Sequence, residues 1–202
     1  MALPVLWFLS GSREARSAVP QAPPPAELAH ATFAGGCFWC MESPYDDIPG
    51  VYSTTAGYAG GHVKSPSYEQ VSSGTTGHAE SLKIVFNSTQ LTYRHLLFEF
   101  FRMHNPTTRN RQGNDIGTQY RSAIFWHDAA QRSVAEASRD HYQARLDAAG
   151  RGRITTQIAP APEFWYAEDY HQQYLAKNPN GYCGLGGTGV SCPIGTGVTS
   201  GA

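Results

Sequence analysis

Alternation between apolar and polar residues predicts short β-strands in this chain. Residues 81–86 place Leu82, Ile84 and Phe86 on one face, which is the period of two expected for a half-buried strand. β-Branched and aromatic residues that end in a glycine pair support a second strand over 51–58. Similar patterns predict three further strands, over residues 31–34, 122–126 and 153–158.

Apolar residues at helical spacing predict four helices. The clearest is 92–103, where four large apolar side chains between positions 96 and 101 form one stripe. Thr92 is placed to cap the start of this helix, and Pro106 lies just past its end. The other predicted helices are 37–45, 128–149, which begins with Asp128 as cap, and 166–177.

These elements mix without strict strand–helix alternation, so the chain is predicted to be an α+β domain with a small mixed or antiparallel sheet packed against helices. The length of 202 residues suits one domain. A proline-rich lead-in predicts a disordered or signal-like leader over 1–27, before a catalytic α+β domain at 28–177. Residues 178–202, called the tail below, are glycine-rich and uncharged, so we expect a flexible coil.

Charge and hydropathy exclude two classes of partner. The formal net charge of -1 argues against nucleic acid, and no apolar run approaches the roughly 20 residues that span a bilayer. Residues 2–9 are apolar, but Pro4 interrupts them and basic residues follow them instead of preceding them. A signal peptide normally has the opposite order. We therefore expect a cytoplasmic protein, with export through this segment left open.

The cysteines are the most informative residues for chemistry. Cys37 lies in a Gly-Gly-Cys-Phe-Trp-Cys sequence between a predicted strand and a predicted helix. Exposed N–H groups and the dipole at a helix N-terminus stabilise a thiolate, so we expect a lowered pKa for Cys37. Cys183 and Cys192 lie in the tail, where they are free to travel. Two structural disulfides are less favoured, because a chain of this length does not need them.

Other candidate residues carry weaker signals when each is taken alone. Glu80, at the mouth of the strand 81–86, has the setting of a general acid if burial raises its pKa. Tyr68 and Tyr120 offer phenolic O–H groups to a developing oxyanion. The ordinary alternatives are a solvated glutamate and two core tyrosines. Asp115 lies in a Gly-Asn-Asp-Ile-Gly sequence and is equally compatible with a turn.

Four motifs together resemble one known family. They are Gly36-Cys37-Phe38-Trp39, Gly77-His78-Ala79-Glu80, the stretch Gly117 to Ser122, and Gly181-Tyr182-Cys183-Gly184. In order and spacing the chain resembles the peptide methionine sulfoxide reductase A family from about residue 31 to 193. The resemblance implies an α+β, two-layer sandwich with a ferredoxin-like core. It also implies reduction of the S epimer of methionine sulfoxide, free or in proteins.

The resemblance assigns roles within the reaction. Cys37 looks like the nucleophile that attacks the sulfoxide sulfur, and Glu80 looks like the donor of a proton to the oxygen. The other implied roles are hydrogen bonding to that oxygen by Tyr68 and Tyr120, a cage for the methyl group made by Phe38 and Trp39, and substrate contacts by Asp115 and Tyr174.

Regeneration is also implied by the resemblance. Cys37 becomes a sulfenic acid, the first and reversible oxidation product of a thiol. Cys183 then condenses with Cys37, and Cys192 moves the disulfide to the Cys183–Cys192 pair, a substrate for thioredoxin. This chemistry needs no metal or organic cofactor, and a monomer is expected.

One position departs from the commonest family pattern. Where glycine often follows Phe38-Trp39, this chain has Cys40, which creates a C-x-x-C sequence. Free cysteine is commonly buried as a small apolar residue. Our hypothesis from the sequence is therefore that Cys40 is dispensable, because the tail thiols already complete the relay.

Two other classes of protein fit part of the sequence. A thioredoxin-like dithiol oxidoreductase would use Cys37 and Cys40 but leave the tail cysteines idle. A zinc-binding module would use all four cysteines as ligands. The spacing from Cys183 to Cys192 is wider than the usual ligand pair of structural zinc.

Overall fold

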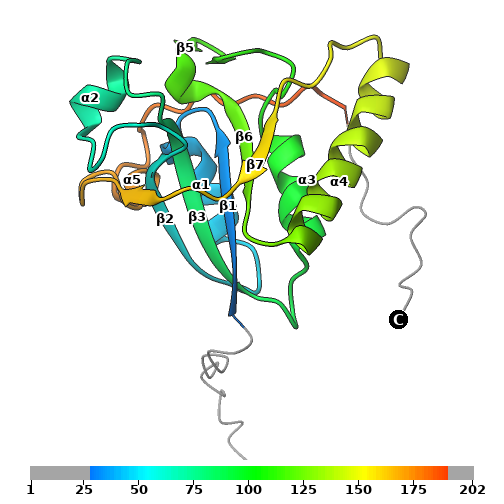
Figure 1. Cartoon of the computed structure of the whole chain (residues 1–202), viewed down its shortest axis with the longest axis horizontal. Helices are drawn as coiled ribbons and strands as arrows, with labels where there is room; N and C mark the ends of the chain where they lie inside the picture. The colour runs from blue at the N-terminus through cyan, green and yellow to red at the C-terminus, as the bar shows by residue number, and fades with distance from the viewer. Residues whose placement is uncertain (1–27, 191–202) are drawn as a thin grey trace, which may run out of the picture.

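The computed structural model describes residues 28–190 (Figure 1). The predicted leader at 1–27 and the predicted role of Cys192 fall outside the described residues. The strands are β1 (Leu28–Gly35), β2 (Val51–Ala59), β3 (Ala79–Asn87), β4 (Arg111–Gln112), β5 (Asp115–Ile116), β6 (Ser122–Trp126), β7 (Gln157–Pro160) and β8 (Phe164–Tyr166). The helices are α1 (Phe38–Asp46), α2 (Tyr68–Ser72), α3 (Tyr93–Met103), α4 (Ala129–Ala148) and α5 (Tyr174–Lys177), with a 3-10 turn, η2, at Thr118–Tyr120.

A six-stranded mixed sheet forms the centre of the described structure. Its strand order is β7-β6-β1-β3-β2-β8, and every neighbouring pair is antiparallel except β6 and β7. β4 and β5 make a separate two-stranded hairpin. The predicted α+β class is confirmed, while the ferredoxin-like label for the core stays a prediction.

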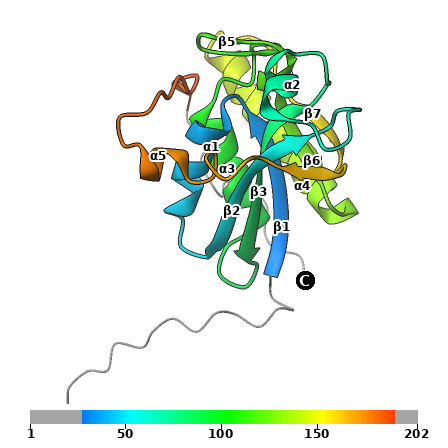
Figure 2. The same cartoon turned by 90° about the vertical axis from the view of Figure 1, so that its left-hand side faces the viewer.

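The main core lies between one face of the sheet and three helices. Alternate residues of the strands, such as Phe33, Leu82, Ile84 and Ile124, pack in one cluster with buried side chains of α1, α3 and α4. The amphipathic stripe predicted for α3 supplies four of the buried residues of this cluster. α3 and α4 lie side by side in Figure 1, and α5 lies beside α1 in Figure 2. Hydrophobic burial on one face of the sheet therefore fixes α1 relative to β3.

The strongly periodic elements form where the sequence predicts them, and the later part of the chain differs. The strand predicted at 153–158 is displaced to 157–160. The helix predicted at 166–177 is wrong except for its last turn at α5. Phe164–Tyr166 instead pairs with β2, and Gln173 adopts a left-handed conformation with φ 54. The Gln172 side chain accepts a hydrogen bond from the Ala56 N–H and donates one to the Ala56 carbonyl, and these tertiary contacts override the local helical pattern.

A glycine elbow joins β1 to α1. Gly36 has a φ of +107°, a backbone conformation that residues with a side chain rarely adopt. A Cβ at this position would also lie 2.7 Å from the Gln112 side chain and 3.2 Å from Leu185. The elbow therefore brings the chain from the sheet into the helix within two residues, and it places Cys37 at the start of α1.

Replacing this glycine tests how closely the elbow is packed. We predict that Gly36→Ala lowers the free energy of unfolding by about 2 kcal/mol, from backbone strain and close contact combined. Gly150→Ala is the control, since Gly150 has φ +65 but no neighbour within 4 Å of the added carbon. Urea denaturation of both variants measures the difference. Equal losses for the two would contradict close packing at the elbow.

Candidate active site

Cys37 is the residue that immediately precedes α1. It occupies the N-cap position and is only 7% exposed. Its carbonyl oxygen accepts hydrogen bonds from the N–H groups of Cys40 and Met41, at 3.1 and 3.3 Å. The helix therefore begins as predicted, and the thiol lies within the field of its free N–H groups.

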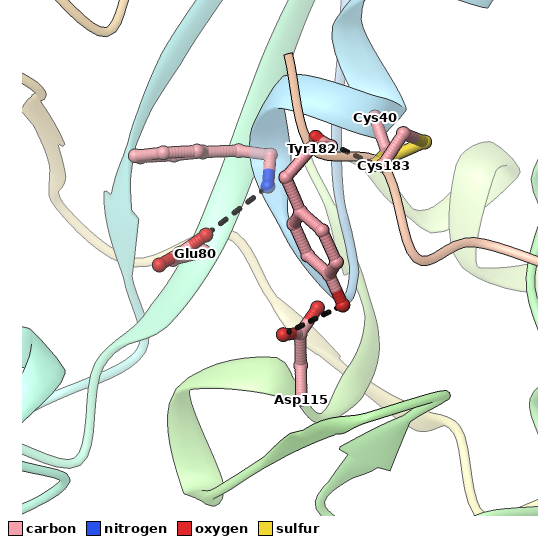
Figure 3. Close-up of a disulfide and its surroundings, with 6 residues drawn as sticks. Cys40, Glu80, Asp115, Tyr182 and Cys183 are labelled. Atoms are coloured by element: carbon pink, nitrogen blue, oxygen red, sulfur yellow. Dashed lines mark hydrogen bonds between the residues drawn. A yellow bond between two sulfur atoms is a disulfide. The ribbon is translucent and has the colours of Figure 1, made fainter.

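Glu80 meets Cys37 at the same helix end. Glu80 lies on β3, opposite Tyr58 of β2, and is 2% exposed. Its Oε2 accepts a hydrogen bond of 3.1 Å from the backbone N–H of Phe38, the residue directly after Cys37. Figure 3 shows the Glu80 side chain reaching from its strand toward the start of α1. The structure thus brings the predicted acid and the predicted nucleophile together.

Burial controls the protonation of both groups. Removal from water, followed by the charge of Asp115, raises the pKa of Glu80 to about 8, although the Phe38 N–H opposes this shift. Burial, followed by the charge of Glu80, raises the pKa of Cys37 to about 12. The N–H groups of Trp39 and Cys40 lower the pKa of Cys37 as the sequence predicts, but burial outweighs them. The net lowering of the Cys37 pKa that we expected from the sequence is therefore wrong for the structure with the Cys40–Cys183 disulfide.

Two phenols share this environment. Tyr68 begins α2 and Tyr120 ends the η2 turn. Burial is the first cause that raises the pKa of each, and the charges of Glu80 and Cys37 raise it further. Both side chains therefore remain neutral O–H donors next to the acid and the thiol.

Asp115 joins the site from the β4–β5 hairpin. Its charge raises the pKa of both Glu80 and Cys37, so the carboxylate faces the same space. Asp115 Oδ1 accepts a 3.2 Å hydrogen bond from the Tyr182 hydroxyl, which reaches across from the tail (Figure 3). The tail residue Tyr182 is therefore hydrogen-bonded to the carboxylate for which the family resemblance implies a substrate contact.

Phe38 and Trp39, the two residues after Cys37, pack among other aromatic rings. Phe38 is buried, with its ring centroid 5.9 Å from Tyr58 and 5.0 Å from His171. Trp39 stacks on Tyr174, with centroids 3.8 Å apart and an interplanar angle of 15°. The structure thus brings Tyr174 of α5 to the predicted cage, where an apolar methyl group would find ring faces.

Residues 168–173 contribute side chains that hold site residues in place and that the sequence did not predict. His171 Nδ1 accepts a 3.0 Å hydrogen bond from Trp39 Nε1, which fixes the indole. Glu168 accepts hydrogen bonds from the Tyr58 hydroxyl at 2.8 Å and from the Tyr68 N–H at 2.9 Å. Because residues 166–177 were predicted to form a helix, the sequence did not indicate that these side chains reach the site. The acidic and histidine side chains next to aromatics were the only available signal.

A disulfide connects the tail to α1. Cys40 and Cys183 are bonded, with their Cα atoms 5.4 Å apart, and Cys37 is the free cysteine of the described residues. The structure therefore pairs Cys183 with Cys40, whereas the resemblance implied a bond from Cys183 to Cys37. Cys40 is buried as predicted, but it is not an isolated thiol. Within residues 28–190, no cluster of metal-ligating side chains was found.

The fold and these contacts define a mixed α+β protein with a buried cysteine beside a buried carboxyl group. A family model described as peptide methionine sulfoxide reductase matches residues 29–189, and the chain belongs to this family. Peptide methionine sulfoxide reductase MsrA 1 of Synechocystis sp. is 56% identical over 182 residues, covering 90% of this chain and 82% of that protein. The thioredoxin-like alternative is not favoured.

Solved structures agree with this assignment. Methionine sulfoxide reductase A of Corynebacterium diphtheriae has 42% identity and a TM-score of 0.75, covering 84% of both chains. Mxr1 from Saccharomyces cerevisiae in complex with Trx2 has 25% identity and a TM-score of 0.53, covering 77% of this chain and 91% of that chain.

The raised pKa of Glu80 predicts a specific dependence of stability on pH. The pKa is about 8 in the folded chain and 4.5 for an ordinary glutamate, so stability from this group is lost as the pH rises from 4.5 through 8. Glu80→Gln removes this titration. We expect the Tm of the oxidised wild type to fall more than that of the oxidised variant over this interval. Parallel Tm curves would contradict a raised pKa.

Proposed function

We propose that this chain reduces the S epimer of methionine sulfoxide to methionine, both in proteins and as the free amino acid. The observation that carries the proposal is the position of Glu80, buried and hydrogen-bonded to the N–H that follows Cys37. With a pKa of about 8, Glu80 holds a proton near neutral pH. A sulfoxide oxygen needs that proton before its sulfur accepts a nucleophile.

The proton on Glu80 also favours ionisation of Cys37. An ionised Glu80 is one of the causes that raise the pKa of Cys37, so a neutral Glu80 removes that repulsion. Cys37 attacks the sulfoxide sulfur while Glu80 protonates the oxygen. Tyr68 and Tyr120 donate hydrogen bonds to the same oxygen. The products are methionine and the sulfenic acid of Cys37, so one oxygen atom moves from substrate to thiol and the substrate sulfur gains two electrons.

The remaining site residues hold the substrate. Phe38 and Trp39 enclose the S-methyl group and exclude water, with Trp39 fixed by a hydrogen bond to His171 and by stacking on Tyr174. Asp115 holds a polar part of the substrate, in the place that the Tyr182 hydroxyl now takes. This arrangement implies that the tail moves away before a substrate enters.

Thioredoxin is the reductant that we propose for the oxidised chain. A structural relative, Mxr1, has been solved in complex with Trx2. Electrons arrive through sulfur alone, so the reaction requires no metal or organic cofactor.

We further propose a monomer that acts in the cytoplasm. No helix among residues 28–190 is long and apolar enough to cross a membrane.

The choice of epimer tests the reaction directly. The reduced chain is expected to convert the S epimer of N-acetylmethionine sulfoxide with a dithiol reductant and to leave the R epimer unchanged. Chiral chromatography of the remaining sulfoxide measures both. Consumption of only the R epimer would overturn the proposed function.

The acid role of Glu80 makes a second prediction. Glu80→Gln keeps the shape of the side chain but removes its transferable proton, so the rate of methionine formation should fall by about 10²-fold or more. In the wild type, this rate should decline as the pH rises above about 8, where Glu80 ionises. Stopped reactions in a single turnover measure the chemical step. A variant with the wild-type rate and the same pH profile would remove Glu80 from the mechanism.

A further inference from the structure

The disulfide lies on a thiol that the proposed reaction does not use. Cys37 carries out the attack, yet Cys183 is bonded to Cys40 and Cys37 is free. The disulfide between the tail and α1 therefore does not include Cys37, the residue that attacks the substrate. Figure 3 shows Cys40 and Cys183 joined on one side of the Tyr182 backbone, away from the Glu80 carboxyl.

Cys37 and Cys40 are neighbours on one turn of helix. Cys37 is the N-cap residue of α1, and Cys40 is the third residue after it. The side chain of an N-cap residue faces the backbone N–H of that third residue, and the Cys40 N–H is one of the groups that lower the pKa of Cys37. Both residues are buried. A sulfenic acid at Cys37 would therefore form beside Cys40, within the same buried space.

The tail is docked so that Cys183 faces Cys40. On one side of Cys183, the Tyr182 hydroxyl donates to Asp115. On the other side, Leu185 packs over the elbow at Gly36. Further along, Tyr142 of α4 is hydrogen-bonded to Thr188 Oγ1 at 2.6 Å, and its hydroxyl donates to the Val190 carbonyl at 3.1 Å. These contacts hold residues 182–190 along a defined path, with Cys183 opposite Cys40.

We propose that Cys40 is the first resolving thiol of this enzyme, an inference that rests on the proposed function. The Cys40 thiol attacks the sulfur of the Cys37 sulfenic acid, which forms a Cys37–Cys40 disulfide and releases one water. The Cys183 thiolate then attacks Cys40 Sγ. This step forms the Cys40–Cys183 bond and expels Cys37 as a thiolate, so no electron is gained or lost by the protein in the exchange.

This order moves the oxidation from the buried site to the surface. Cys183 is exposed, whereas Cys37 and Cys40 are buried. A dithiol reductant therefore reaches Cys183 without reaching the buried Cys37. Its attack on the Cys183 sulfur forms a mixed disulfide and releases Cys40, and its second thiol then frees Cys183 and leaves the reductant oxidised. Cys40 therefore has a defined task in this proposal. This task takes the place of the hypothesis from the sequence that Cys40 is dispensable.

Single-turnover mapping in the absence of reductant tests this order. The full chain carrying Cys183→Ser and Cys192→Ser is reduced, mixed with the S epimer of N-acetylmethionine sulfoxide, and quenched with an alkylating agent and dimedone. We expect methionine to form and the peptide that contains Cys37 and Cys40 to carry neither label, lighter than the dithiol by two hydrogens. Adding Cys40→Ala to this chain should leave a dimedone-labelled Cys37. In the chain that carries only Cys192→Ser, the Cys40–Cys183 cross-link should appear.

Two controls and the measured yield of methionine separate the possible failures. Ser43→Ala, on the exposed side of the same helix, should leave the Cys37–Cys40 product unchanged, and circular dichroism verifies that each variant folds. A dimedone-labelled Cys37 next to an alkylated Cys40 in the chain that lacks the tail thiols would overturn the inference alone, because methionine has still formed. Absence of methionine from the wild type would instead overturn the proposed function.

Discussion

The hydrogen bond from the Phe38 N–H to the Glu80 carboxyl connects the chemistry of this protein to its fold. It joins the first turn of α1 to the third strand of the chain, and it holds a carboxyl group next to Cys37. The N–H is one of the groups that a helix leaves without a partner inside itself. The same bond therefore satisfies the helix end, orients the acid and fixes its distance from the nucleophile. The core packing of α1 against the sheet keeps this bond in place.

Burial gives this arrangement its reactivity, and it also creates a difficulty that the tail resolves. A buried carboxyl keeps its proton, and a buried thiol resists ionisation, although a neutral Glu80 removes one of the causes of that resistance. The same burial shields an oxidised Cys37 from any protein reductant. A path of exchange through Cys40 to the exposed Cys183 carries the oxidation outward. The enzyme thereby separates substrate reduction from its own regeneration in space.

The sequence predicted which residues meet at the start of α1 more completely than it predicted the later elements of the fold. Cys37, Glu80 and Trp39 lie in short motifs at the ends of strongly periodic strands and helices. Local pattern and tertiary packing therefore agree at these residues. Residues 166–177 show the opposite case, since strand pairing with β2 and the side chain of Gln172 decide their conformation. No local pattern encodes those contacts. The partner of Cys183 was likewise hidden, because the pairing of cysteines depends on how the tail docks.

Direct titration of Glu80 is the most decisive measurement for this account. Carbon NMR of a chain labelled at the glutamate carboxyl groups, with Glu80→Gln used to assign the resonance, reports the protonation of this one side chain. We expect a midpoint near 8 for Glu80 in the oxidised chain. A midpoint near the ordinary glutamate value of 4.5 would contradict it, because the acid would then be ionised when the substrate binds.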